Sequence, residues 1–189
     1  MALTWRVVAG SSLGRSSVVA TSAVYARAAM TEPILAADEL EFLSSARRAV
    51  LATIGEDGLP RLVPCCYSVL ERGDGVSPLV LHTPLDEKPK RSGGPHDLAR
   101  VRDILLRADV ALLVDRWSED WDRLAWLRLR GQATVLESDD PGVAEERAQA
   151  IGALRARYRQ YADHALEERP IIRIAVERAT SWGDLSLRA

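Results

Sequence analysis

The 189-residue chain has no asparagine, only two cysteines, and no apolar run that approaches a membrane span. A spanning helix needs about 18 consecutive apolar residues, so we expect no membrane partner. The cysteines, Cys65 and Cys66, are adjacent, and neighbouring side chains on a strand point to opposite faces, which disfavours a disulfide between them. Reduced thiols predict a cytoplasmic protein. The two cysteines and three histidines show no zinc-ligand spacing, so we expect no bound metal.

Charge of one sign is not in excess either. The chain has 25 basic and 27 acidic residues and a net charge of −2. This balance, without interleaved basic and aromatic residues, disfavours a nucleic-acid partner while permitting a local basic patch. Hydrophobic residues make up 47% and charged residues 28% of the chain, close to globular averages. Wholesale disorder is therefore excluded, and the length suits one domain.

Lysine is scarce. Of the 25 basic residues two are lysine, Lys88 and Lys90, and the other 23 are arginine. Such a bias is typical of GC-rich coding, for example in actinobacteria. Two lysines placed two residues apart are either a chance feature of a solvated loop or a pair of compact cationic heads for an anionic ligand.

The first 30 residues differ in composition from the rest. They are rich in serine, contain three arginines and precede the first acidic residue, Glu32. This is typical of a transit peptide. The alternative is a native start at Met30, which is the only methionine besides Met1. In both cases we expect residues 1–30 to be a dispensable extension and 31–189 to form the domain.

The remaining chain alternates short apolar runs with turn signals such as Asp57-Gly58. Pro64 interrupts one run, which indicates an edge, a bulge or a backbone facing a ligand. Strands are expected at 49–54, 59–70, 79–83, 110–115, 125–136 and 171–176. Helices are expected from the cap at Asp38, from Asp97 to 108, and from Asp140 to about 158. Hairpin-linked strands with helices between them predict a mainly β fold of the α+β class, an antiparallel barrel with peripheral helices.

Four segments in order carry a resemblance to a known family. They are Leu51–Pro64, similar to an opening hairpin, Thr83–Arg91, similar to a basic phosphate-binding loop, and the strands Val110–Asp115 and Leu127–Ala133. The chain resembles the pyridoxamine 5'-phosphate oxidase-like FMN-binding split barrels. It is most similar to the actinobacterial branch that uses the deazaflavin coenzyme F420. The resemblance spans about residue 35 to Gly183.

The resemblance implies an antiparallel split β-barrel that forms a homodimer. It implies an F420-dependent oxidoreductase that transfers a hydride between F420 and a small organic substrate. Two alternatives stay open: an FMN-dependent enzyme of the same fold, and a non-catalytic F420 or flavin-binding protein. No Ser-His-Asp, Cys-His or paired-carboxylate pattern identifies a catalytic residue in the sequence.

The resemblance also implies which residues hold the cofactor. The positions that match family contacts are Arg61, Thr83, Lys88, Lys90 and, near the ring, Trp182. Residue chemistry adds two groups to this set. Lys88, Lys90 and Arg91 offer cations to an anionic tail, and Val63, Pro64 and Cys65 offer an apolar slot with backbone donors to a ring.

Ordinary structural roles compete with these assignments. Trp182 fits equally well as core filling, and a buried cysteine commonly acts as a small hydrophobe. Two segments depart from the family pattern, namely Ser92–His96 and the aromatic and acidic Asp115–Trp121. They either shape the mouth of a substrate site or are surface loops.

Overall fold

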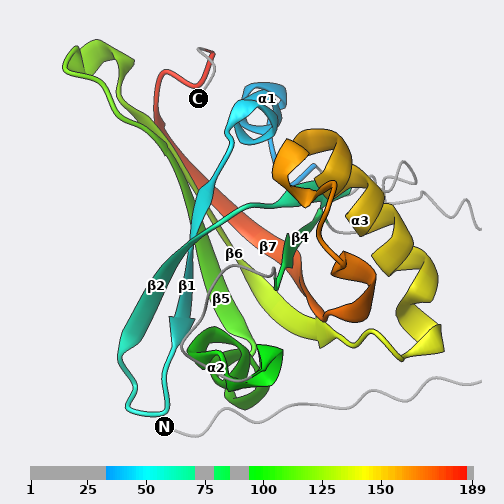
Figure 1. Ribbon diagram of the computed structural model, residues 1–189. Coiled ribbons are helices and arrows are strands. Elements are labelled where there is room, and N and C mark those ends of the chain that lie inside the picture. The colour runs from blue at the N-terminus through cyan, green and yellow to red at the C-terminus, as the bar shows by residue number, and fades with distance from the viewer. Residues whose placement is uncertain (1–32, 71–78, 86–93, 187–189) are drawn as a thin grey trace, which may run out of the picture. The chain divides into compact units, whose positions relative to one another are not determined.

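A computed structural model describes residues 33–70, 79–85 and 94–186 (Figure 1). Within these residues the helices are α1 (Ala37–Ser45), α2 (Ala99–Leu106) and α3 (Ala144–Arg157). The strands are β1 (Ala49–Ile54), β2 (Pro60–Cys65), β3 (Ser68–Leu70), β4 (Val80–Pro84), β5 (Asp109–Arg116), β6 (Ala125–Leu136) and β7 (Ile171–Gly183). None of the described helices is long and apolar enough to cross a membrane.

The described strands form one curled antiparallel sheet in the order β2-β1-β5-β6-β7-β4-β3. The predicted α+β class is confirmed, since this half-barrel with its helices is consistent with a split barrel. The edge strands β2 and β3 are consecutive in the chain and are joined by Cys66 and Tyr67 alone. The two edges of the sheet therefore lie beside each other, which is possible only if the sheet curls.

The single strand predicted over 59–70 is wrong, because the chain turns at this two-residue corner. Tyr67 is fully buried there, and its backbone bonds to a side chain instead of a strand. The Tyr158 hydroxyl accepts from the Tyr67 N–H at 3.1 Å and donates to the Tyr67 carbonyl at 2.9 Å. The Tyr67 hydroxyl in turn donates to the Leu43 carbonyl at 2.6 Å. The corner is thus tied to the last turns of both α1 and α3.

The inner face of the sheet holds the main core. Alternate residues of β1, β5, β6 and β7 point into it, for example Leu51, Leu112, Leu129 and Ile174. Helix α1 adds Phe42 and Leu43, and helix α2 adds Val101 and Ile104. In Figure 1 α1 and α2 lie at opposite ends of the sheet. The core therefore leaves the alternate, outward-pointing residues of the same strands free for another role.

Strand β7 is longer than predicted, running past Val176 to Gly183. Apolar alternation ends at Val176, so the pattern gave no sign of the extension. Pairing with β6 continues through a bulge between Arg130 and Gly131. A Cβ at Gly131 would lie 1.9 Å from the Ala175 carbonyl oxygen, so only glycine allows the two backbones to approach here.

All three helix starts differ from the prediction. Helix α1 begins at Ala37 with Ala36 at its N-cap, so Asp38 lies inside the first turn, and the Glu39 carboxylate accepts from the Ala36 N–H at 2.9 Å. Asp97 belongs to a preceding 3₁₀ turn, where its carboxylate accepts from the Gly94 N–H, and α2 begins at Ala99. Asp140 does cap, as predicted, but what it caps is a 3₁₀ turn that precedes α3. Short polar side chains cap either kind of turn, so sequence does not separate the two.

Helix α3 covers another part of the outer surface, beside β3, β4 and β7 (Figure 1). Beneath it the Glu146 carboxylate bonds both the buried His82 ring, with Nε2 at 2.7 Å, and Arg173, whose Nε donates at 2.9 Å. Burial raises the pKa of Glu146, but the bonds and charges of His82 and Arg173 lower it more, to a net value below the usual 4.5. Glu146 thus stabilises the folded state fully above pH 4.5.

We expect Glu146→Gln to lower the free energy of unfolding at pH 7 by about 1–3 kcal/mol, because two charge-assisted bonds are lost. The difference from the wild type should shrink as pH falls through the lowered pKa, below 4.5. Urea unfolding at several pH values measures this. Glu145→Gln, an exposed neighbour on the same helix, is the control. A difference that does not change with pH would contradict the assignment.

Candidate functional site

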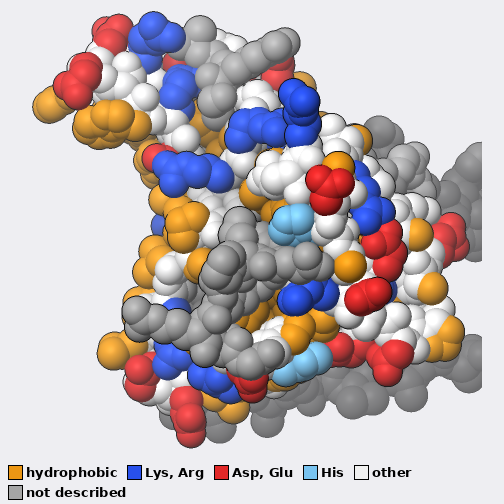
Figure 2. All heavy atoms as spheres, viewed as in Figure 1, with side chains coloured by type: hydrophobic (Ala, Val, Ile, Leu, Met, Phe, Trp, Pro, Cys, Tyr) orange, Lys and Arg blue, Asp and Glu red, His pale blue; other side chains and the backbone are white. Residues whose placement is uncertain are grey.

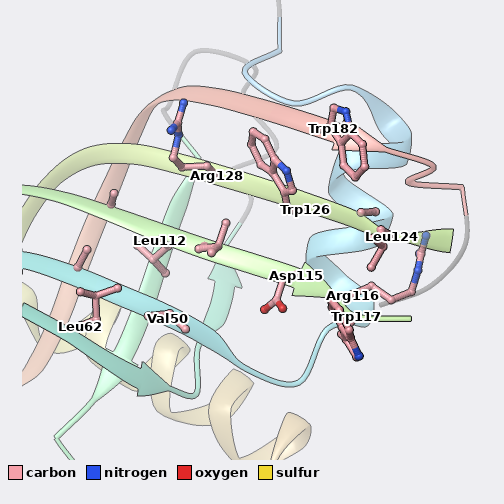
Figure 3. Close-up of a pocket in the computed structure, with 14 residues that line it drawn as sticks. Val50, Leu62, Leu112, Asp115, Arg116, Trp117, Leu124, Trp126, Arg128 and Trp182 are labelled. Atoms are coloured by element: carbon pink, nitrogen blue, oxygen red, sulfur yellow. The ribbon is translucent and has the colours of Figure 1, made fainter. Parts of the chain in front are cut away.

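Mostly outward-pointing residues of β1, β2, β5, β6 and β7, with two residues from the connection between β5 and β6, enclose a hollow of about 520 Å³ on the outer sheet face (Figure 3). Its lining is Val50, Ala52, Leu62, Ala111, Leu112, Leu113, Asp115, Arg116, Trp117, Leu124, Ala125, Trp126, Arg128 and Trp182. We call it the aromatic hollow. Its size falls within the roughly 300–1,000 Å³ of small-molecule sites, and its mostly apolar lining is typical of them.

Strand register brings the aromatic residues together. Trp126 and Trp182 are direct partners across β6 and β7, so both indoles rise from the same face. Trp182 is 54% exposed, which rules out the core-filling role that competed with the ligand role. Trp117 follows β5 and also lines the hollow, so the aromatic and acidic segment Asp115–Trp121 does contribute to its wall. Indoles on one face of a sheet are groups on which a planar ligand can stack.

Three charged residues line the aromatic hollow. The Arg116 guanidinium donates to two backbone carbonyls, those of Arg123 at 2.7 Å and Asp184 at 2.6 Å. The Arg128 guanidinium lies 5.7 Å from the centre of the Trp126 ring, and its buried Nε has no hydrogen-bond partner among the described residues. Asp115 pairs with Trp126 in the strand register. The hollow therefore has one acidic group and one cation with an unmet donor.

A second hollow of about 430 Å³ adjoins the first, and Ala52 and Ala111 line both. Its polar lining includes Arg130 and Arg178, which are partners across β6 and β7. Like charges placed directly opposite each other repel, unless an anion lies between them. A planar apolar body and a charged extension can therefore be bound side by side on this face.

The residues predicted from sequence divide between the two sides of the sheet. Trp182 lines the aromatic hollow, and Pro64 is an exposed strand partner of Val50, which also lines it. Val63 and Cys65 instead pack against the inner core. Lys88, Lys90 and Arg91 lie outside the described residues, so their role stays a prediction.

Arg61 and Thr83 also have partners away from the hollow. The Arg61 Nη1 donates to Asp103 at 3.3 Å, and the same buried carboxylate accepts from the Thr53 hydroxyl at 2.7 Å. Thr83 is buried, and its side chain hydrogen-bonds the Cys65 thiol. Two predicted residues, Cys65 and Thr83, are thus brought into contact. The assignment of Arg61 and Thr83 to the cofactor stays a prediction.

Sequence reasoning missed several residues that the hollow brings together. Trp126, Arg128 and Leu113 are all outward-pointing strand residues. The strict alternation of 125–136 was a usable signal, since it places Trp126, Arg128 and Arg130 on one face. What it did not reveal is that this face is a site, because outward residues of a strand are usually only solvated.

The sequence profile of the pyridoxamine 5'-phosphate oxidase family matches residues 36–183. The chain belongs to this family. No curated protein matches the sequence. Among solved structures of similar fold, a conserved hypothetical protein, Rv2991, from Mycobacterium tuberculosis has 22% identity and a TM-score of 0.57, with 80% of this chain and 86% of that chain covered.

Two further structures show the range of ligands on this fold. A FAD-binding protein from Mesorhizobium loti has 20% identity and a TM-score of 0.52, over 78% of this chain and 94% of that chain. A heme-binding protein from Mycobacterium smegmatis has 20% identity and a TM-score of 0.52, over 77% of this chain and 52% of that chain. At these identities the likeness shows the fold alone.

The lining of the aromatic hollow fits a flavin-type ring better than a heme. A heme iron needs an axial ligand such as His, Cys, Met or Tyr, and the described lining contains none of these. A flavin-type ring needs an apolar slot with a few polar groups at its edge, which the indoles, Arg128 and Asp115 supply. The family binds flavins, and the hollow of this member has a lining suited to one.

The two cysteines differ in environment, which predicts a difference in reactivity. Burial raises the pKa of the Cys65 thiol to about 11, although the Thr83 hydrogen bond partly opposes this. At pH 8 we expect iodoacetamide to modify Cys66 at least tenfold faster than Cys65, because the thiolate is the nucleophile. Peptide mass spectrometry of the native protein measures both rates, and the urea-unfolded protein is the control. Equal native rates would show that Cys65 is accessible and ionised.

Proposed function

We propose that the chain is an F420-dependent oxidoreductase that transfers a hydride between F420 and a small organic substrate. The observation that carries the proposal is the aromatic hollow, with Trp126 and Trp182 side by side and a cation at its edge. Members of the family bind flavins, and F420 has a ring of the same shape. The lysine pair Lys88 and Lys90, with Arg91, offers cations for its anionic tail.

In this proposal the residues of the chain bind the cofactor and orient it. When bound, the deazaflavin supplies the hydride-transferring carbon that replaces a flavin nitrogen, which is chemistry that belongs to the cofactor. Trp126 and Trp182 would hold the planar ring, and Val50, Leu62 and Leu113 would help to exclude water from it.

We also propose that the outer sheet face joins two copies of the chain. Leu62 is 66% exposed, and Leu113 and Trp182 are exposed on the same face. An apolar patch of this kind is unusual on a monomer and marks an interface or a ligand site. A second copy packed on the face would cover Leu62 and close the hollow from above, with two equivalent sites in the dimer.

Titration of F420 and FMN, followed by fluorescence, tests the cofactor proposal. We expect F420 to bind more tightly than FMN, and Trp182→Ala to weaken F420 binding about tenfold, with Trp121→Ala, an exposed tryptophan outside the hollow, as the matched control. Lys88→Ala and Lys90→Ala should each weaken F420 binding ten- to a hundredfold, since a charge-assisted bond contributes about 1.5–3 kcal/mol.

Other outcomes of this titration identify the alternatives. Tighter binding of FMN than of F420 would make the protein an FMN-dependent enzyme of the same fold. F420 binding without turnover of any organic acceptor would make it a carrier. Binding of hemin, with neither F420 nor FMN bound, would overturn the redox proposal altogether.

Light scattering tests the dimer separately. The wild type should have twice the 20.8 kDa mass of one chain, and Leu62→Glu should have the mass of a monomer, because a charge at the interface centre cannot be solvated. Leu105→Glu is the matched control, since Leu105 is 65% exposed on α2 and outside the hollow. A monomeric wild type that still binds cofactor would contradict the proposal.

A further inference from the structure

Arg128 stands out among the cations of this sheet. It lies in the first half of β6, where its direct strand partners are Leu113 on β5 and Thr180 on β7. Its Nε is buried and bonds to no described residue. By contrast, the buried Arg147 has hydrogen-bond partners, because its guanidinium donates to the carbonyls of Leu136, Glu167 and Arg169. Arg128 thus has a buried donor that the described part of the chain does not use.

The acidic residue that lines the hollow, Asp115, does not pair with Arg128. The strand partner of Arg128 on β5 is Leu113. Asp115 lies two residues further along β5, where its own strand partner is Trp126. Figure 3 shows the Arg128 and Asp115 side chains pointing apart, on opposite sides of Trp126. The charged lining residues are therefore Arg128 at one end and the neighbours Asp115 and Arg116 at the other, and the Arg116 guanidinium already donates to the Arg123 and Asp184 carbonyls.

This arrangement selects a particular ligand chemistry. The Arg128 guanidinium lies near the Trp126 ring, so an acceptor that reaches Nε belongs to a ligand lying along the same indole. An anionic acceptor bonds a guanidinium about twice as strongly as a neutral one. A second negative charge at the far end would be repelled by Asp115. We infer that the aromatic hollow binds a planar aromatic monoanion, with its negatively charged edge held by Arg128.

Two sources supply such an anion. One is the deazaflavin ring, whose phenol ionises to an anion delocalised over the ring, and this arm of the inference rests on the proposed function. The other is an aromatic carboxylate bound as substrate. FMN has an isoalloxazine ring that is neutral at pH 7, so its ring gains less from Arg128. The Arg128 guanidinium is therefore the group that would favour the binding of F420 over that of FMN.

The closing experiment uses two probes of equal shape, 2-naphthoate and 2-naphthamide, titrated into the full-length protein by calorimetry at pH 7. We expect naphthoate to bind at least tenfold more tightly than the neutral naphthamide. Arg128→Met should reduce this preference to less than twofold. Arg130→Met is the matched control, since Arg130 is the next outward residue of β6 and lines the second hollow, and it should keep the preference within twofold.

Each result decides something. Equal affinity of the two probes for the wild type, or no binding of either, would overturn the inference. An equal loss of preference in both arginine variants would also overturn it, because the effect would then be general electrostatics. Should Arg128→Met lose its thermal unfolding transition, Arg128→Gln replaces it, with the same expected loss of preference.

The same variants separate the two sources. If Arg128→Met weakens F420 binding tenfold or more and FMN binding less than threefold, the anion is the deazaflavin ring. If naphthoate loses its preference while both cofactors bind as before, the anion is a substrate. If F420 does not bind the wild type but naphthoate is preferred over naphthamide, the proposed function fails and this inference stands.

Discussion

A sheet that curls until its edges meet needs a way to join them, and here the join is the corner at Cys66 and Tyr67. Tyr67 is fully buried in it, where an unbonded amide would be strongly destabilising. The Tyr158 hydroxyl bonds both backbone groups of Tyr67, and Arg157 donates to the Ser44 carbonyl at the end of α1. The corner fixes the direction of β2, and with it the face to which Leu62 points.

The strands that build the core also build the site, because successive residues alternate between the two sides. On β6, Leu127 and Leu129 are buried inside, while Trp126 and Arg128 line the hollow outside. The inner half contributes burial of apolar area, which stabilises the fold. The outer half leaves apolar side chains exposed. It also leaves one guanidinium donor, the Arg128 Nε, without a hydrogen-bond partner among the described residues. A ligand or partner bound on that face would reduce the energetic cost of both.

The fold could largely be predicted, because alternation and turn signals are local. The run 49–54 was assigned with the bounds of β1, whereas β7 was cut short where its apolar alternation ended, although pairing through the Gly131 bulge carries it further. The site could be predicted only in part. Trp182 was found through the family resemblance, but Arg128 looks like any solvated strand arginine until three strands are placed in register.

The two-sided division of β6 has a consequence for how this protein can change over generations. Mutations at the outer positions alter the hollow without creating a cavity or an overpacked site in the core, so they carry little of the usual penalty in stability. Trp126 and Arg128 are both such outer positions, so we expect their replacement to cost less stability than replacement of Leu127 or Leu129. New ligand preferences can therefore evolve on this fold at a small cost in stability. We expect its relatives to differ in what they bind.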